Sequence, residues 1–226
     1  MTRKNKLTIL GLVLLALTSA GLYSVYWFQA SERAVAAYVT FMEAHSDKAV
    51  PPTPPEVSGF PGKIRLFVAR DSFLQKGALI EFSNLEVIGW PSPGVPVNIS
   101  ADTITITPYG APVVIPFDTF AANFTYYPRK VDIQKAVLSN GEFRIGLSGG
   151  VVFDNGDPLL DLIVTAENHT QALNTLLQAN MIEPKAAMMI NAGLGVFRDK
   201  DGNIRLPLTT NKNGRIMAGP IPVGRL

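Results

Sequence analysis

The sequence predicts a mainly β protein of the α+β class, in which an N-terminal transmembrane helix precedes a curved antiparallel β-meander with a helix pair packed on it. Three observations predict this architecture. Residues 7–28 carry no formal charge, most of residues 63–166 alternate apolar and polar side chains, and residues 170–193 show helical spacing. The 226 residues are enough for one sizeable core outside the membrane.

The first predicted element is the uncharged run at residues 7–28. As a helix, these 22 residues rise about 33 Å, which matches the hydrocarbon core of a bilayer. Arg3, Lys4 and Lys6 precede the run, and the positive-inside bias places them in the cytoplasm. The rest of the chain is therefore expected on the other side. Aromatic residues mark the far interface of this span: Tyr23, Tyr26, Trp27 and Phe28.

A cleaved signal peptide is the competing interpretation, because Thr18, Ser19 and Ala20 offer the small residues that a signal peptidase requires. Against cleavage, the apolar run continues past this site and ends in the aromatic residues. We therefore expect a signal-anchor. The expected organisation is a cytoplasmic tip and anchor at residues 1–28, a stalk helix and proline-rich linker at residues 29–56, and a β-rich domain at residues 57–226.

Charge and cysteine content exclude several classes of function. Three of the 20 Lys and Arg residues precede the anchor, so 17 remain against 18 Asp and Glu, and the exported part has a net charge of about −1. Without a basic surplus it cannot neutralise many phosphates, so no nucleic-acid partner is expected. The chain has no cysteine, which rules out disulfides and thiolate metal sites. No cofactor is expected.

The anchor should continue as a helix over residues 30–44, where Ala34 and Tyr38 lie on one side. The four prolines among residues 51–55 end any helix, because proline lacks the backbone donor. The folded domain is expected to begin near Val57.

Within that domain, period-two alternation and short turns predict strands joined by local hairpins. Near Asp102 the alternation changes phase, which predicts a β-bulge that curves the sheet. Residues 139–141 and 154–157 are typical hairpin turns. The predicted strands are residues 63–68, 79–82, 85–90, 97–106, 113–117, 121–127, 131–138, 143–147, 151–153 and 160–166.

Two helices are predicted at residues 170–181 and 184–193, the second opening with Pro184 in its first turn. Their apolar faces should bury against the sheet. The chain then returns to strands across turns at residues 199–202 and 213–214, which are rich in residues that tolerate left-handed geometry.

Several short motifs give a resemblance to a known family. They are Trp27 before a short helix, Gly59-Phe60-Pro61 at the first strand, the helix pair, and a closing stretch from Leu206-Pro207-Leu208 to Gly219-Pro220. The chain resembles a bacterial family of membrane-anchored periplasmic proteins of unknown function, similar in pattern to AsmA-like envelope proteins. The resemblance implies a single-pass protein of the bacterial inner membrane with its C-terminal domain in the periplasm, and a lipid-facing apolar groove. It implies no catalytic residues.

Catalytic motifs are present only in part, so no enzyme is predicted. The glycine-rich stretch around Ser148 matches the nucleophile elbow, yet a strand rather than a helix follows it. His45 and His169 are far apart in sequence, and an exposed polar role is expected for each. Asp199 and Asp201 begin a calcium-like loop that lacks its turn glycine and distal glutamate, which favours a hairpin turn. No metal site is predicted.

Two functions of different classes remain. In the first, the curved sheet leaves an apolar groove in which envelope lipid binds or passes. In the second, the domain is a scaffold or assembly component that meets another envelope protein through a sheet edge or face. An enzyme is a third hypothesis. The groove would be lined by Leu66, Phe82, Ile104, Ile106, Phe124, Leu147 and Leu162. The competing interpretation of these side chains is a closed core.

Overall fold

The computed structural model describes residues 3–45, 53–75, 77–90, 92–108, 114–154, 157–178, 182–211 and 214–225, with side chains described from Leu15 onward except at residues 157 and 223–225. Parts of several predicted elements lie outside the described residues: the prolines at 51 and 52, residue 113, the turn residues 155 and 156, and residues 179–181 and 213. All other predicted elements can be compared with the structure.

The fold is mainly antiparallel β-sheet with few helices, as predicted. The helices are α1 (Arg3–His45), α2 (His169–Gln178), α3 (Pro184–Leu194) and the 3-10 turn η1 (Gly195–Phe197). The strands are β1 (Glu56–Ser58), β2 (Ile64–Gln75), β3 (Ala78–Gly89), β4 (Pro96–Ala101), β5 (Thr103–Pro108), β6 (Ile115–Phe117), β7 (Thr119–Tyr127), β8 (Lys130–Ser139), β9 (Arg144–Asp154), β10 (Asp157–Glu167), β11 (Ile204–Thr210), β12 (Arg215–Ala218) and β13 (Ile221–Arg225).

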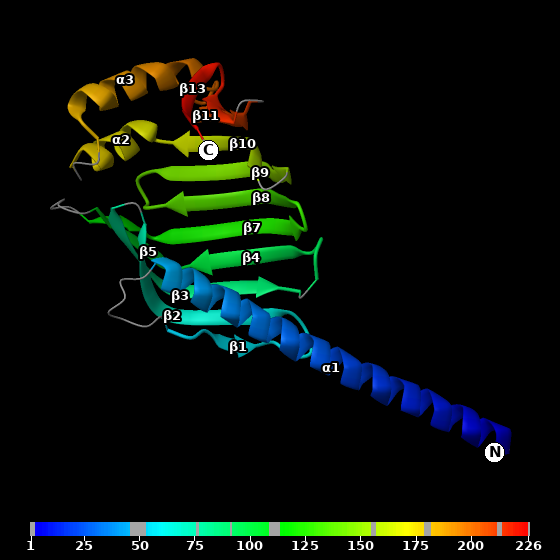
Figure 1. Cartoon of the computed structure of the whole chain (residues 1–226). Helices are drawn as coiled ribbons and strands as arrows, with labels where there is room; N and C mark the ends of the chain where they lie inside the picture. The colour runs from blue at the N-terminus through cyan, green and yellow to red at the C-terminus, as the bar shows by residue number, and fades with distance from the viewer. Residues whose placement is uncertain are drawn as a thin grey trace.

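These strands form one sheet in the order β1-β2-β3-β4-β7-β8-β9-β10-β11-β12-β13, while β5 pairs with β3 and β6. Neighbours in the sheet are almost always neighbours in the chain, so the predicted meander is confirmed. Figure 1 shows α1 crossing β2 and β3 at one end of the sheet, and α2 and α3 at the other end. The sheet therefore separates two helical regions.

Irregular backbone explains two differences between the predicted and the observed strands, while β2 runs on to Gln75 beyond the predicted end at residue 68. The predicted pair at residues 79–82 and 85–90 is one strand, β3, which passes through Asn84 at a φ of 50°. Similarly, β9 continues through Gly149 at a φ of 122°, where a side chain would overlap the backbone of Asp161 on β10. The bulge predicted near Asp102 inside one strand at residues 97–106 is instead a boundary between two strands, β4 and β5, and each of these pairs with a different half of β3. A local left-handed residue can thus keep a strand continuous, which alternation alone does not reveal.

The second half of α1 lies on the sheet. Trp27 is 2% exposed and packs with Ile64 and Leu66, and Met42 is 1% exposed and packs with Val68 and Phe82. The segment predicted as a stalk therefore contributes to the core. Two side chains at the start of this contact also bind a turn of the domain, as Tyr23 Oη donates to the Pro61 carbonyl at 2.7 Å and Trp27 Nε1 to the Gly62 carbonyl at 2.9 Å.

No helix in the described part of the chain contains a stretch long and apolar enough to cross a membrane. The transmembrane character predicted for residues 7–28 is therefore not supported by the structure. For residues 7–14 of that predicted span, the structure describes the backbone but not the side chains.

The helix pair is inserted between the neighbouring strands β10 and β11. α2 buries Leu173, and its Ala172 and Leu176 pack on a cluster of Ile115, Phe117 and Phe143. This agrees with the predicted burial of its apolar face. α3 differs, because it buries Ala187 but leaves other large apolar side chains of α3 and η1 in solvent: Met188 at 76%, Met189 at 67% and Val196 at 80% exposed.

Candidate functional site

The strand register gathers apolar side chains on one face of the sheet. Residues that lie directly opposite each other on neighbouring strands point to the same face, so a row of partners can be followed across the sheet. Two such rows cross six neighbouring strands, from β4 to β11. The first row is Val97, Phe124, Ile133, Gly149, Leu162 and Leu208. The second row is Ile99, Ala122, Ala136, Leu147, Val164 and Leu206. We call this side the apolar face.

The opposite side is the polar face, where charged and amide side chains pair with each other. Arg65 on β2 forms an ion pair with Glu86 on β3, and Lys130 Nζ lies 2.8 Å from Asp132 Oδ1 on β8. Asn123 Nδ2 donates to Asn98 Oδ1 at 2.6 Å. The sheet is thus two-sided, with one face suited to water and the other to an apolar layer.

In the part of the chain that the structure describes, helices cover the apolar face only at its ends. Leu66 packs with Trp27 of α1, and Leu138 and Ile145 pack on the Ile115, Phe117 and Phe143 cluster that α2 also covers. Between them, Figure 1 shows no described helix across β7, β8 and β9. There Phe124 and Leu147 remain half-buried although their neighbours in the rows are apolar. The middle of the apolar face is therefore partly accessible.

The seven residues predicted to line a groove all lie on this apolar face. Four of them pack in clusters closed by other elements: Leu66 with Trp27, Phe82 with Met42, and Ile104 and Ile106 with the Ile115, Phe117 and Phe143 cluster. Three lie in the rows: Phe124, Leu147 and Leu162. Leu162 is buried, whereas Phe124 and Leu147 are half-buried. The structure thus places the set on one surface but not around one cavity.

A cavity of about 440 Å³ lies where α1 crosses the apolar face. Its volume is in the range of small-molecule sites. Leu66 is the predicted groove residue in its wall. Sequence reasoning missed the wall that α1 contributes, although three- and four-residue spacing places these side chains on one side of a helix. The α1 residues are Tyr26, Ala30, Arg33 and Ala34, and the other walls are Ile64, Leu66, Val87, Gly89, Trp90, Pro93 and Val97.

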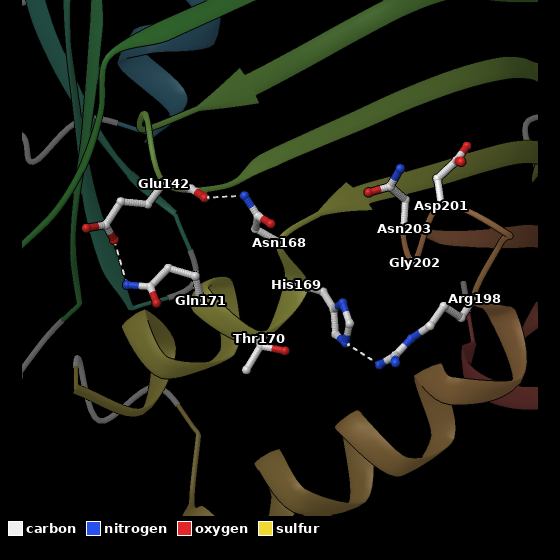
Figure 2. Close-up of a pocket in the computed structure, with 9 residues that line it drawn as sticks. All are labelled: Glu142, Asn168, His169, Thr170, Gln171, Arg198, Asp201, Gly202 and Asn203. Atoms are coloured by element: carbon white, nitrogen blue, oxygen red, sulfur yellow. Dashed lines mark hydrogen bonds between the residues drawn. The ribbon is translucent and has the colours of Figure 1, made fainter.

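A second, polar pocket of about 670 Å³ lies where β9 begins, β10 ends and α2 starts (Figure 2). Asn168 Nδ2 donates to the Glu142 carbonyl at 2.9 Å, and Gln171 Nε2 donates to Glu142 Oε2 at 2.6 Å. On the other side of the pocket, Figure 2 shows Arg198 reaching His169. These bonds tie α2 to the strand ends, which gives the pocket a structural role.

His169 is 7% exposed, so the predicted exposed role for this histidine is wrong. Its Nε2 lies 3.2 Å from Arg198 Nη2 and 3.2 Å from Asn191 Oδ1. A guanidinium only donates and an amide oxygen only accepts, so in a given tautomer Nε2 forms one of these two hydrogen bonds: it accepts from Arg198 or it donates to Asn191. With Nε2 occupied, the ring is poorly placed to take a proton from a substrate. No group of three or more metal-ligating side chains occurs among the described residues.

His169→Ala is expected to destabilise the protein by about 1–3 kcal/mol, because the buried imidazole and its side-chain hydrogen bond are lost. The neighbouring exposed Thr170 gives the control, since Thr170→Ala should change the free energy of unfolding by less than about 0.5 kcal/mol. Thermal unfolding of both variants measures this. Equal shifts would contradict the buried role of His169.

The fold and these sites define a protein with one meander sheet, whose apolar face is covered by helices only in part. The C-terminal half of the chain, residues 117–226, matches the model of the family DUF2125, described as an uncharacterized protein conserved in bacteria. This match supports the predicted similarity to a bacterial family of unknown function. Comparisons with curated proteins and with solved structures found no match.

Proposed function

We propose that this is a non-enzymatic protein anchored in the bacterial inner membrane, whose periplasmic domain binds or passes envelope lipid on the apolar face. The observation that carries the proposal is the pair of apolar rows that no described helix covers at β7, β8 and β9. Large apolar surfaces exposed to water are costly, and they commonly mark binding sites.

The dimensions of the rows suit an acyl chain. Six neighbouring strands at a spacing of about 4.8 Å give each row a length of about 24 Å. One leaflet of a bilayer is about 15 Å of hydrocarbon, so a row is long enough to hold one chain lying flat across the strands. The polar face would meanwhile stay in water.

The proposed function includes an anchor in the inner membrane, formed by the first part of α1. Residues 7–28 would span the inner membrane, with Arg3, Lys4 and Lys6 in the cytoplasm. Because α1 continues without a break from this segment onto β2 and β3, the anchor would lead directly to the apolar face. The AsmA-like pattern of the sequence is in line with such a lipid-facing sheet.

A scaffold in an envelope complex is the second candidate function. The exposed Met188, Met189 and Val196 favour it, because flexible methionine side chains are common at protein-binding surfaces. This patch belongs to α3 and η1, at the end of the sheet away from α1 (Figure 1).

Photo-crosslinking in living cells tests lipid binding. A benzophenone amino acid replaces Leu147, whose side chain lies on the apolar face, or the adjacent Ser148, which points to the polar face. We expect lipid adducts on the full-length protein at position 147 at about ten times the yield at position 148, as measured by mass spectrometry. Both positions lie on the same strand at the same depth in the sheet. A difference in lipid-adduct yield therefore reports only which face of the sheet the side chain lies on.

Other crosslinking results would decide against lipid binding or in favour of the scaffold function. Equal lipid yields at the two positions, or none at either, would overturn the lipid proposal. Adducts to one protein at position 147, without lipid, would support the scaffold function instead.

A further inference from the structure

We propose that the 440 Å³ cavity between α1 and the sheet takes a phospholipid from the periplasmic leaflet, with the phosphate bound by Arg33 and an acyl chain against the apolar wall. This inference rests on the proposed function and names the place where lipid would first meet the protein. It follows from the chemistry of the cavity, its depth along α1 and its connection to the rows.

The cavity wall combines apolar side chains with one positive charge. Among the described residues of the wall, Arg33 is the only charged side chain, and none of them is a carboxylate. It is exposed, and no ion pair joins it to another residue in the described part of the chain. A guanidinium on the rim of an apolar cavity suits an amphiphile with a phosphate, which it can bind through two parallel hydrogen bonds.

The position of Arg33 along α1 sets its depth relative to a bilayer. It lies five residues beyond Phe28, where the apolar run ends, which is about 7.5 Å farther along the helix. The headgroup layer of a bilayer extends about 5–8 Å beyond the hydrocarbon on each side. If residues 7–28 span the membrane, Arg33 therefore lies at the level of the phosphates.

A rigid junction keeps the cavity at that level. Trp27 is buried between α1 and the sheet, and its indole donates to the Gly62 carbonyl. Tyr23 binds the carbonyl of the neighbouring Pro61. Phe28 stacks on Phe60 at a centroid distance of 5.5 Å. The domain is thus held to α1 where the helix would leave the hydrocarbon.

The cavity leads onto the apolar face. Val97 lines the cavity and is also the first member of the first row. Its direct partner across β4 and β7 is Phe124. An acyl chain that enters beside Ala34 could therefore extend from Val97 to Phe124 without meeting a charged side chain.

The test uses the full chain reconstituted in vesicles of phosphatidylethanolamine and phosphatidylglycerol that contain a photoactivatable phosphatidylglycerol. Labelled peptides from wild type should include cavity residues of α1 and β4, such as Ala34 and Val97. Arg33→Gln should lower cavity labelling at least about tenfold, because a charged hydrogen-bond donor to the phosphate is lost. Arg33→Lys should be intermediate, since it keeps the charge but not the two-bond geometry.

Two controls make the result specific. Arg129→Gln removes an exposed charge in the β7–β8 turn and should leave labelling unchanged. A photoactivatable diacylglycerol, which has no phosphate, should label wild type and Arg33→Gln equally.

The outcomes separate this inference from the proposed function. If peptides of the rows around Leu147 are labelled but cavity peptides are not, or Arg33→Gln labels like wild type, the cavity inference fails and lipid binding stands. If neither region is labelled, both fail.

Discussion

Gly59→Ala is expected to destabilise the protein by about 4 kcal/mol or more, the range of severe single substitutions. Gly59 has a φ of 104°, which side chains rarely adopt, and a methyl group there would overlap the carbonyl oxygen of Lys63. Since the obstacle is backbone, it cannot rotate away, and the turn from Gly59 to Gly62 must rearrange. That turn supplies the carbonyls that bind Tyr23 and Trp27.

The control for this substitution is Gly202→Ala. Gly202 also has a positive φ, 83°, but open space surrounds the position of the added methyl group. Its cost should be only the backbone strain, about 1–2 kcal/mol. Thermal unfolding of the full chain in detergent compares the two variants. If both lose the same stability, backbone strain alone accounts for Gly59, and its close contact with Lys63 has no energetic role.

Trp27→Ala is expected to cost about 3–5 kcal/mol, as for other buried large-to-small changes. The indole is 2% exposed against Ile64 and Leu66, and its N–H donates to Gly62. Loss of this side chain leaves a void and removes a hydrogen bond between α1 and the domain. The second half of α1 should then detach more readily from the sheet.

Phe28 gives the matched control, because it is the next residue on α1 and 53% exposed. Phe28→Ala should cost no more than about 1 kcal/mol, the part due to its ring contacts with Phe60 and Trp27. Thermal unfolding measures stability, and hydrogen exchange of α1 backbone amides shows whether the helix detaches. Equal exchange in both variants would show that Trp27 does not hold α1 on the sheet.

The strands were predictable because their signal is local. Alternation places one side of each strand on an apolar layer, and turn residues such as those at 139–141 fix the hairpins that join neighbours. The phase change at Asp102 likewise located the boundary between β4 and β5. Alternation could not show that β3 and β9 pass through Asn84 and Gly149 without ending, since a left-handed residue resets the phase inside one strand.

The candidate sites were less predictable, because each depends on contacts between distant segments. Arg33 is an ordinary exposed residue of a helix until α1 is laid across β2 and β3, where it becomes the charged member of an apolar cavity wall. The same applies to His169, because its partner Arg198 lies 29 residues away in the sequence and only the fold brings the two side chains within 3.2 Å.

By itself, the sequence determined the antiparallel meander, the place of the helix pair and the set of side chains on the apolar face, because periodicity records which side of an element avoids water. Only the tertiary structure decided which of those side chains are covered. The apolar residues of α1 suit a bilayer and a protein core equally, so hydropathy cannot distinguish the two. Trp27 and Met42 face the sheet because the register of β2 and β3 offers apolar side chains where α1 crosses them.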